Sequence, residues 1–276
     1  ICDLDFTNCN QDFKKLNDLP EDLYNLDILD GSPPCSSFST SGAREKKWGK
    51  KSHFREGQAA QNLDDLFFEY IDVAEKLRPK IIVAENVRGL IIGNAKGYVK
   101  KIFESFKKAG YETQLFSLNE ANMGVPQSRQ RVFFIANRIG KKIHLKFDEA
   151  IIPLKTALDG LDVSTASPLG DRMIAFWHKC QAGKSISSVH PKGMLWNSKK
   201  LHPDHPSFTL TATSADKLLY HWDSPRTLSH DEIKSIGSFP MDFDFLKDAN
   251  LGYTIGMSVP PFMMERIARQ IALQLL

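Results

Sequence analysis

Apolar runs of strand length that alternate with helical segments constrain the fold of this chain more than any other feature. The runs are "NLDILD", "KIIVAEN", "YETQLFSL" and "RVFFIA". Between the first two, apolar residues recur at helical spacing from about residue 61 to residue 77, and Pro79 ends the pattern. A second helical segment, "GYVKKIFESFKKAG", follows the second run and ends on Gly110. This order predicts βαβ units and a parallel sheet.

The stretch from about 166 to 228 lacks this periodicity and is rich in Ser, His, Lys, Gly and Pro. We interpret it as a separate, loop-rich domain. The C-terminal segments "SHDEIKSIG" and "PPFMMERIARQIALQLL" are helical again, with Pro260 and Pro261 at the start of the last helix. The length of 276 residues suits one large domain and one small one.

Composition argues against several classes of protein. No apolar run approaches the roughly 20 residues that span a bilayer, so we expect a cytoplasmic protein with no membrane partner. The cysteines form no CxxC pair, which argues against a disulfide scaffold and a zinc finger, and we expect no metal. The net charge of +3 is too small to indicate a polyanionic partner by itself, so a basic patch has to be found locally.

A thiol and a carboxylate follow two neighbouring strand candidates. Cys35 lies in the loop just past the first of these strands, and Glu85 lies just past the end of the second. Because ligands of open parallel sheets sit beyond the carboxyl ends of the strands, these side chains can serve one substrate as nucleophile and proton donor. Taken alone, each residue has a simpler explanation, since a lone cysteine is more often a buried apolar group and such a glutamate usually caps a helix or pairs with a lysine.

Five motifs in a fixed order favour the catalytic explanation over the simpler ones. The segments "GSPPCSSFS", "AENVRGL", "GVPQSRQRVFFIA", "SPRTLSHDEIKSIGSFPMDF" and "IGMSVPPFMMERIA" closely resemble motifs IV, VI, VIII, IX and X of the DNA cytosine-5 methyltransferases. The resemblance covers most of the chain except residues 139 to 205. It implies the S-adenosylmethionine-dependent methyltransferase (Rossmann-like) α/β fold, with a mostly parallel sheet, helices on both faces and a small loop-rich target recognition domain.

The same resemblance implies the domain organisation and the origin of the protein. Residues 1–165 would form the catalytic methyltransferase domain, residues 166–228 the target recognition domain, and residues 229–276 a segment that returns to the catalytic domain. We expect a bacterial or phage modification enzyme, a monomer, with a cognate restriction endonuclease as a further partner.

The resemblance also assigns chemistry to the thiol and the carboxylate. Carbon 5 of cytosine is a poor nucleophile, and a thiolate that adds to carbon 6 turns the ring into an enamine that attacks a sulfonium methyl group. Cys35 would be that thiolate. Electron density that moves toward ring nitrogen 3 needs a proton or a strong hydrogen bond there, which the carboxyl group of Glu85 would supply.

Four further residues match the family around these two. Arg131 matches the arginine that contacts the cytosine oxygen, and Arg129 matches one that steadies the active-site loop or a nearby phosphate. Asn86 and Gln127 are expected to hold loops rather than to react. The residues together imply a DNA (cytosine-5-)methyltransferase that acts on double-stranded DNA and rotates its target base out of the stack.

The segment that follows the cysteine carries a local basic cluster. Residues 43–55, "AREKKWGKKSHFR", suit a mobile loop that closes over phosphates, although such a run is usually only a solvated face. The candidate DNA-binding residues in and before it are Ser39, Arg44, Lys46, Lys47, Lys50, Lys51 and Arg55. Farther along, "HPSFTLTATSADK" resembles a recognition-domain segment, which makes Thr209, Thr211 and Ser214 candidate contacts; they could equally be ordinary strand residues.

The cofactor implied by the family is S-adenosyl-L-methionine, which is converted to S-adenosyl-L-homocysteine. The residues that match its contacts are Asp12, Phe13, Pro34, Leu66, Ser258 and Val259. Met257 stands where the family has an asparagine in the last motif, so one hydrogen bond to the cofactor that the resemblance implies is not expected here.

The family's first strand and glycine-rich loop have no counterpart among these residues. Either the sequence lacks a segment that the protein has, or the protein is truncated. We expect the former, because a parallel sheet without its first strand would expose two neighbouring edges.

Two other functions stay open. The same fold could methylate cytosine in RNA, although a small substrate domain and the basic loop favour DNA. The missing cofactor loop and Met257 would suit a catalytically silent DNA-binding relative, but the presence of both Cys35 and Glu85 argues against it.

Overall fold

The computed structural model spans residues 1–276 and describes residues 21–33, 51–52, 61–62, 66–92, 96–195, 197–213, 215, 217–245 and 251–276. The chain divides into two compact units. The first unit comprises Ile1–Leu118, Arg131–Ile143 and Leu275, and the second comprises Asn119–Gln130, His144–Gln274 and Leu276. The predicted domain boundaries at 165 and 228 stay a prediction.

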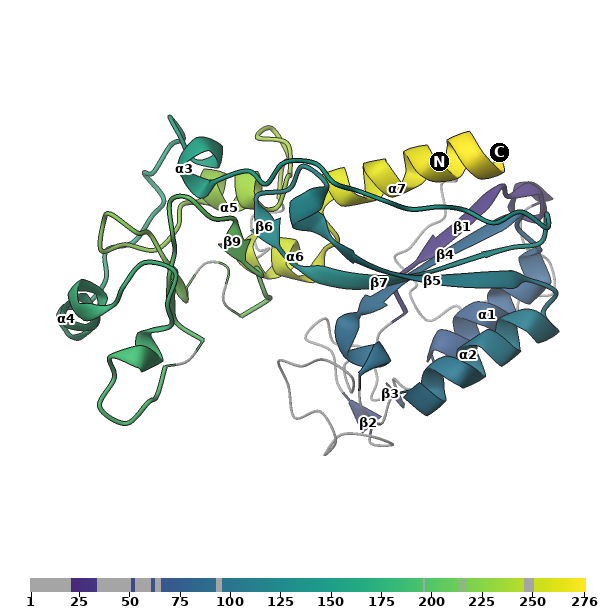
Figure 1. Ribbon diagram of the computed structural model, residues 1–276, viewed down its shortest axis with the longest axis horizontal. Coiled ribbons are helices and arrows are strands. Elements are labelled where there is room, and N and C mark those ends of the chain that lie inside the picture. Colours follow the sequence, from purple (N-terminus) through teal and green to yellow (C-terminus); the bar gives the residue numbers. More distant parts are fainter. Residues whose placement is uncertain are drawn as a thin grey trace. The chain divides into compact units, whose positions relative to one another are not determined.

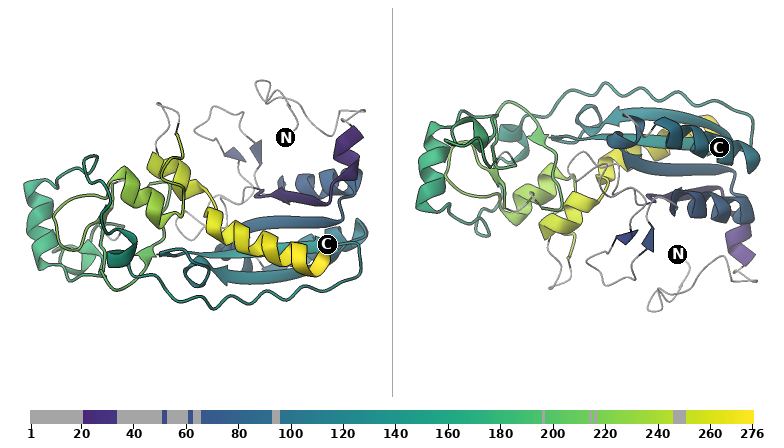
Figure 2. Two further views of the ribbon diagram at one scale, coloured as in Figure 1. Left: turned by 90° about the horizontal axis from the view of Figure 1, so that it is seen from above. Right: turned by 90° about the horizontal axis from the view of Figure 1, so that it is seen from below.

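A four-stranded sheet forms the centre of the first unit. Among the described strands the order is β1-β4-β7-β5, with β1 at one end of the row (Figures 1 and 2). The strands are β1 (Ile28–Gly31), β4 (Ile81–Val87), β5 (Glu112–Asn119) and β7 (Gln130–Asn137). They coincide with the apolar runs of the sequence, which confirms the four predicted strands.

The directions of the strands follow from the connections between them. β1 and β4 are parallel, with Ile28 opposite Ile81 and Gly31 opposite Ala84, and a helix lies between them in sequence as the βαβ prediction requires. β7 is antiparallel to β4 and departs from that prediction. Residues 120–129, which connect β5 to β7, are fewer than the dozen or so that a parallel crossover needs.

Two helices pack side by side against one face of this sheet, α1 (Leu66–Leu77) and α2 (Lys96–Lys108) (Figure 1). Their apolar stripes form the core of the unit, where Phe67, Phe106 and Phe134 are fully buried. A 3-10 turn, η4 (Arg88–Ile91), follows β4, and another, η2 (Glu21–Asn25), precedes β1.

The boundaries of both helices have local causes. The prediction of a helix from about residue 61 was wrong at its start, because Gln61–Asn62 form β3 and pair antiparallel with β2 (Lys51–Ser52). The end of α2 is confirmed: Gly110 has a φ of 89°, the left-handed conformation with which glycine ends helices.

The second unit consists of short elements joined by loops and of one longer helix, α7 (Pro261–Leu275); the elements within residues 166–228 are all short, as predicted. The short elements of the unit are η6 (Glu120–Asn122), β6 (Gln127–Ser128), α3 (Leu154–Ala157), α4 (Asp171–Lys179), η7 (Ile186–Ser188), β8 (Lys199–Lys200), β9 (Ser207–Phe208), β10 (Leu219–Tyr220), α5 (His230–Ile236) and α6 (Leu251–Met257). The strands pair in parallel as β6 with β9 and β8 with β10. Leu154, Leu210 and Ile233 are buried at the centre of its larger apolar core.

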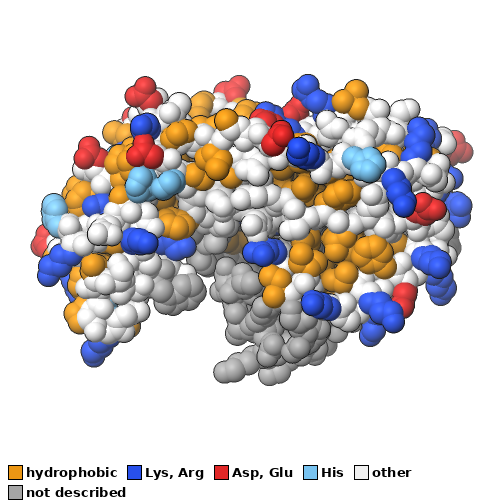
Figure 3. All heavy atoms as spheres, viewed as in Figure 1, with side chains coloured by type: hydrophobic (Ala, Val, Ile, Leu, Met, Phe, Trp, Pro, Cys, Tyr) orange, Lys and Arg blue, Asp and Glu red, His pale blue; other side chains and the backbone are white. Residues whose placement is uncertain are grey.

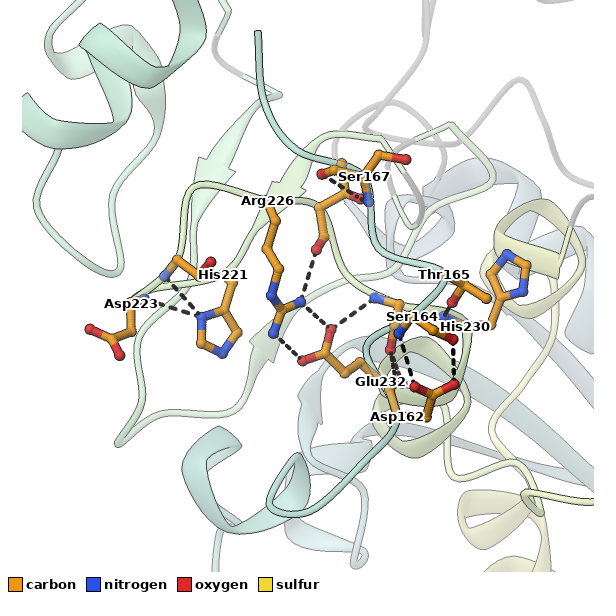
Figure 4. Close-up of polar contacts among 12 residues, drawn as sticks. Asp162, Ser164, Thr165, Ser167, His221, Asp223, Arg226, His230 and Glu232 are labelled. Atoms are coloured by element: carbon orange, nitrogen blue, oxygen red, sulfur yellow. Dashed lines mark hydrogen bonds and ion pairs between the residues drawn. The ribbon is translucent and has the colours of Figure 1, made fainter. Parts of the chain in front are cut away.

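A polar network fixes the start of α5 (Figure 4). Ser229 and Glu232 form a reciprocal capping box, and the guanidinium of Arg226 binds both carboxylate oxygens of Glu232 at 2.7 and 2.8 Å. Burial alone would raise the pKa of Glu232, but the hydrogen bonds from Arg226 and Ser229 outweigh it and lower the pKa. The Ser229 hydroxyl also donates to the carbonyl of Asp162 at 2.7 Å, which ties the helix to the preceding loop.

Charged side chains of both signs lie among apolar ones on the face in Figure 3, and those in the lower part of this view are mainly blue. Within the described part of the chain, no helix is long and apolar enough to cross a membrane.

Candidate active site

Two predicted catalytic residues meet on the sheet of the first unit. The prediction that Glu85 lies past the end of a strand was wrong, because β4 continues to Val87 and pairs Glu85 with Phe133 of β7. Arg131 lies two residues before Phe133 on β7. Diagonal neighbours of this kind share a face of an antiparallel pair. The Arg131 Nε lies 3.0 Å from the Glu85 Oε1, and the two side chains are only 15% and 11% exposed. The guanidinium therefore orients a mostly buried carboxylate.

The neighbouring Asn86 holds the loop that follows β1. Its side-chain Nδ2 donates to the carbonyl oxygen of Pro33 at 3.2 Å, and its Oδ1 accepts from the Val87 N–H at 2.8 Å. Asn86 is 3% exposed, and Pro33 is also buried. The prediction that Asn86 holds a loop is confirmed. The loop that it holds leads, two residues after Pro33, to Cys35.

Arg129 and Gln127 bind one backbone segment of the second unit. The Gln127 Oε1 accepts from the Leu210 N–H at 2.6 Å, and the Arg129 Nη1 donates to the carbonyl oxygens of Leu210 at 2.6 Å and Gly256 at 2.9 Å. Both side chains are buried. The loop-holding role of Gln127 is confirmed. Arg129 holds the backbone at Leu210 and Gly256, and its predicted contact with the active-site loop or a nearby phosphate stays a prediction.

Residues 207–213, which we name the recognition segment, are joined to residues 126–129 along the backbone as well. β9 pairs with β6, and the Ser207 N–H donates to the carbonyl of Pro126 at 2.9 Å. The Thr209 hydroxyl donates to the carbonyl of Ser128, also at 2.9 Å. Thr209 therefore has a structural partner, and its contact with DNA stays a prediction.

The far end of the recognition segment lies directly against α6. A Cβ placed on Gly256 would lie 2.5 Å from the Ala212 nitrogen and would also collide with the backbone of Thr211. The Thr211 hydroxyl lies 3.4 Å from that of Thr213. The sequence assigns no individual role to Leu210 or Gly256, because both take part in these contacts through backbone atoms.

The family is decided by a comparison that spans nearly the whole chain. Residues 4–273 match the model of the C-5 cytosine-specific DNA methylases. The chain belongs to this family. It is therefore a DNA cytosine-5 methyltransferase by descent, and the α/β fold, with the motif order that pointed to it, is confirmed.

Curated relatives and solved structures agree. The chain is 27% identical to the Type II methyltransferase M.NgoFVII of Neisseria gonorrhoeae, over 94% of this chain and 73% of that protein. It is 28% identical to M1.HphI of Haemophilus parahaemolyticus, over 89% of this chain and 68% of that protein. In fold it resembles a DNA modification methyltransferase encoded within an E. coli prophage, with a TM-score of 0.63 and 20% identity over 90% of this chain and 79% of that chain. It also resembles the S. pombe Dnmt2 methyltransferase, with a TM-score of 0.58 and 15% identity over 90% of this chain and 78% of that chain.

The described residues fit parts of the cofactor that this family uses. In the first unit, Leu66 is a partly buried apolar residue at the first position of α1, which suits contact with an adenine ring. In the second unit, the Ser258 hydroxyl donates to the carbonyl of Thr254 at 2.7 Å, so its oxygen can accept from a ligand; Val259 beside it is partly buried. Met257 is 59% exposed, and its thioether cannot replace the amide of the family asparagine.

The other predicted site residues lie outside the described part of the chain. They are Cys35, Asp12, Phe13, Pro34, Ser39, Arg44, Lys46, Lys47, Lys50, Arg55 and Ser214. Of Lys51 only the backbone is described, in β2. Among the described residues, no group of three or more His, Cys, Asp and Glu side chains could hold a metal ion.

Proposed function

We propose that the protein transfers a methyl group from S-adenosyl-L-methionine to carbon 5 of a flipped-out cytosine in duplex DNA through a covalent adduct with Cys35. The buried Glu85–Arg131 pair carries this proposal, because it supplies an oriented carboxyl group one residue from the asparagine that holds the loop to Cys35. Family membership supports the class of reaction.

Cys35 would begin the reaction as a thiolate that adds to carbon 6 of the ring. Two residues of chain reach at most about 7 Å, so the fixed carbonyl of Pro33 limits where this thiol can lie. The electron pair displaced by the addition moves toward ring nitrogen 3 and makes carbon 5 nucleophilic. After methyl transfer, a base removes the carbon 5 proton, the electron pair of that C–H bond forms the carbon 5–carbon 6 double bond, and the sulfur leaves carbon 6 as the thiolate of Cys35.

Glu85 and Arg131 would act on the ring as a unit. Glu85 holds a proton or hydrogen bond at ring nitrogen 3, where negative charge develops during the addition. A guanidinium can bind a carboxylate through Nε and a second acceptor through its Nη groups, so Arg131 can orient Glu85 and contact the cytosine oxygen together.

The cofactor would supply an electrophilic methyl group on a sulfonium sulfur. Leu66 would pack on its adenine ring, and Ser258 and Val259 would contact it from the last motif. Asp12, Phe13 and Pro34 complete the proposed set.

DNA recognition would fall to residues 166–228 and to the basic run at 43–55. In the second unit, Thr209 and Thr211 of the recognition segment are the proposed contacts, and the backbone bonds to residues 126–129 would keep that segment in place. The relatives are named as Type II methyltransferases, so a cognate endonuclease for the same DNA site is part of the proposal. We place the enzyme in the cytoplasm of a bacterium, as a monomer.

Methyl transfer to matched DNA and RNA duplexes tests the proposal. Cys35→Ala should abolish transfer from labelled S-adenosylmethionine to DNA and leave DNA binding largely intact. Cys180→Ala is the matched control, because Cys180 is a buried thiol that lies 3.5 Å from the carbonyl of Gln181 and is not one of the proposed catalytic, cofactor or DNA contacts. Transfer that survives in Cys35→Ala would overturn the mechanism, and transfer only to RNA would overturn the substrate.

A further inference from the structure

We propose that Tyr70 is a positioning residue for methyl transfer, whose phenol group braces the ends of β1 and β4 where the chain leads to Cys35 and Glu85. This inference rests on the proposed function, because it concerns the placement of the two groups named there. All the contacts that carry it lie in the first unit.

The hydroxyl of Tyr70 lies between two strands. It is 2.9 Å from the carbonyl oxygen of Leu29 in β1 and 3.1 Å from that of Val83 in β4. Val83 is opposite Asp30, the residue after Leu29, so the two carbonyls are neighbours across the parallel pair. A hydroxyl has one proton, which both acceptors share. Val83 lies two residues before Glu85, so the brace acts immediately ahead of the carboxylate.

The ring of Tyr70 also fixes the next step of β1. A Cβ placed on Gly31 would lie 2.5 Å from the Tyr70 Cε2 and 3.1 Å from its Cζ. The ring therefore packs on the backbone of Gly31, and only glycine leaves room for it. Gly31 begins the segment "GSPPC", so the brace acts on the strand just before the loop to Cys35.

The Tyr70 ring also contacts the aromatic core of the first unit. Tyr70 meets Phe67 edge-on at 6.4 Å between ring centroids. Phe67 is itself fully buried and meets Phe106 at 6.2 Å and Phe134 at 5.3 Å. Because closely packed aromatic rings move little, the core restrains Tyr70 and keeps its hydroxyl group in place at the ends of β1 and β4. Burial first, and then the neighbouring Asp30, raise the pKa of Tyr70, so its hydroxyl stays a donor.

The alternative is that Tyr70 only stabilises the fold. A comparison with Tyr111 distinguishes this role from the positioning role. The Tyr111 hydroxyl donates to the carbonyl of Pro79 at 2.9 Å, and the carbonyl of Ala74 lies 3.4 Å away. Pro79 lies just before β4, at the opposite end from Glu85. Tyr111→Phe therefore removes the same kind of bond from the same unit, far along the strand from the proposed chemistry.

The experiment compares Tyr70→Phe with Tyr111→Phe in the full chain. Protein, S-adenosylmethionine and a duplex that carries 5-fluorocytosine are mixed, and formation of the covalent adduct is followed in a single turnover. The amplitude counts the folded enzyme, and the rate constant reports the placement of the reacting groups. We expect Tyr70→Phe to lower the rate constant by about ten-fold, because displacement of the reacting groups by a fraction of an ångström slows the reaction. Tyr111→Phe should lower it by less than about two-fold.

A second pair of variants tests the ring contact. Gly31→Ala should slow adduct formation in the natural chain and add little in a Tyr70→Ala background, where the added methyl group has no ring to meet. If Cys35→Ala forms no adduct, two results would overturn the positioning role of Tyr70 alone. One is a rate constant that falls equally in Tyr70→Phe and Tyr111→Phe, and the other is a rate constant that does not fall in Tyr70→Phe. An adduct that persists in Cys35→Ala would overturn the proposed function and the role of Tyr70 with it.

Discussion

Arg131 and Glu85 are joined across the β4–β7 pair by a contact of 3.0 Å between Nε and Oε1, with both side chains mostly buried. Glu85→Gln keeps the shape of the side chain and removes its charge. We expect methyl transfer to fall by about 10²–10⁴-fold, the range for loss of a general acid or base. Glu149→Gln is the matched control, since Glu149 pairs with Arg266 at a more exposed site. A Glu85→Gln enzyme with the rate of that control would contradict the proposed role.

Arg131→Ala should affect chemistry more than binding. The residue is 15% exposed in its side chain and holds a carboxylate, which leaves little of it to contact a DNA backbone. Transfer rate and affinity for a nonspecific duplex are measured at one salt concentration. If both fell by the same factor, Arg131 would be a phosphate contact rather than part of the reaction.

Gly256→Ala should destabilise the second unit. The added Cβ would lie 2.5 Å from the Ala212 nitrogen, and the recognition segment would have to shift, at a cost of about 1–3 kcal/mol. Gly97→Ala in α2 is the matched substitution, because no atom lies within 4 Å of its new Cβ; we expect it to stabilise by about 0.4–1 kcal/mol. The melting temperature of Gly256→Ala should fall and that of Gly97→Ala should rise. Shifts in the same direction would refute the close approach of α6 to the recognition segment.

Protonation of His221 should lower the stability of the folded protein as the pH falls. Burial first, and then the charge of Arg226, lower the pKa of His221 from 6.5 to about 4. Its Nδ1 accepts from the N–H groups of Asp223 at 3.2 Å and Ser224 at 3.3 Å, so the neutral ring is the one that fits (Figure 4). The unfolded chain protonates His221 more readily than the folded chain does. The contribution of His221 to the free energy of unfolding is therefore complete above about pH 6.5 and is lost as the pH falls toward 4.

A His221→Asn variant tests this dependence, because its side-chain oxygen can still accept a hydrogen bond but cannot be protonated. The two melting temperatures are compared at pH 8, which sets the baseline, and then at steps down to pH 4. The wild-type value should fall more steeply below pH 6.5 than the variant's. Curves that stay parallel would show that His221 does not titrate as proposed.

Much of the first unit could be predicted from the sequence because its signals are local. Apolar runs gave the strands, and Gly110 gave the end of α2. The order of motifs pointed to Glu85 and Arg131, which the sheet then brings together. The direction of β7 was missed because the apolar runs indicate strands but not which way each one runs.

Contacts between distant residues could not be predicted in the same way. Arg129 binds the carbonyls of Leu210 and Gly256, which lie 81 and 127 residues away along the chain. Backbone acceptors carry no residue type, so no pattern could indicate them. Tyr70 had the spacing of a core position of α1, and its polar role depends on where two strands end.

Denaturing mass spectrometry of the protein after incubation with S-adenosylmethionine and a 5-fluorocytosine duplex tests the central claim most directly, because the fluorine blocks the final elimination. A covalent adduct whose peptide maps to Cys35, and which is absent from Cys35→Ala, is the predicted result. An adduct at another residue, or active methyl transfer with no adduct, would contradict the mechanism.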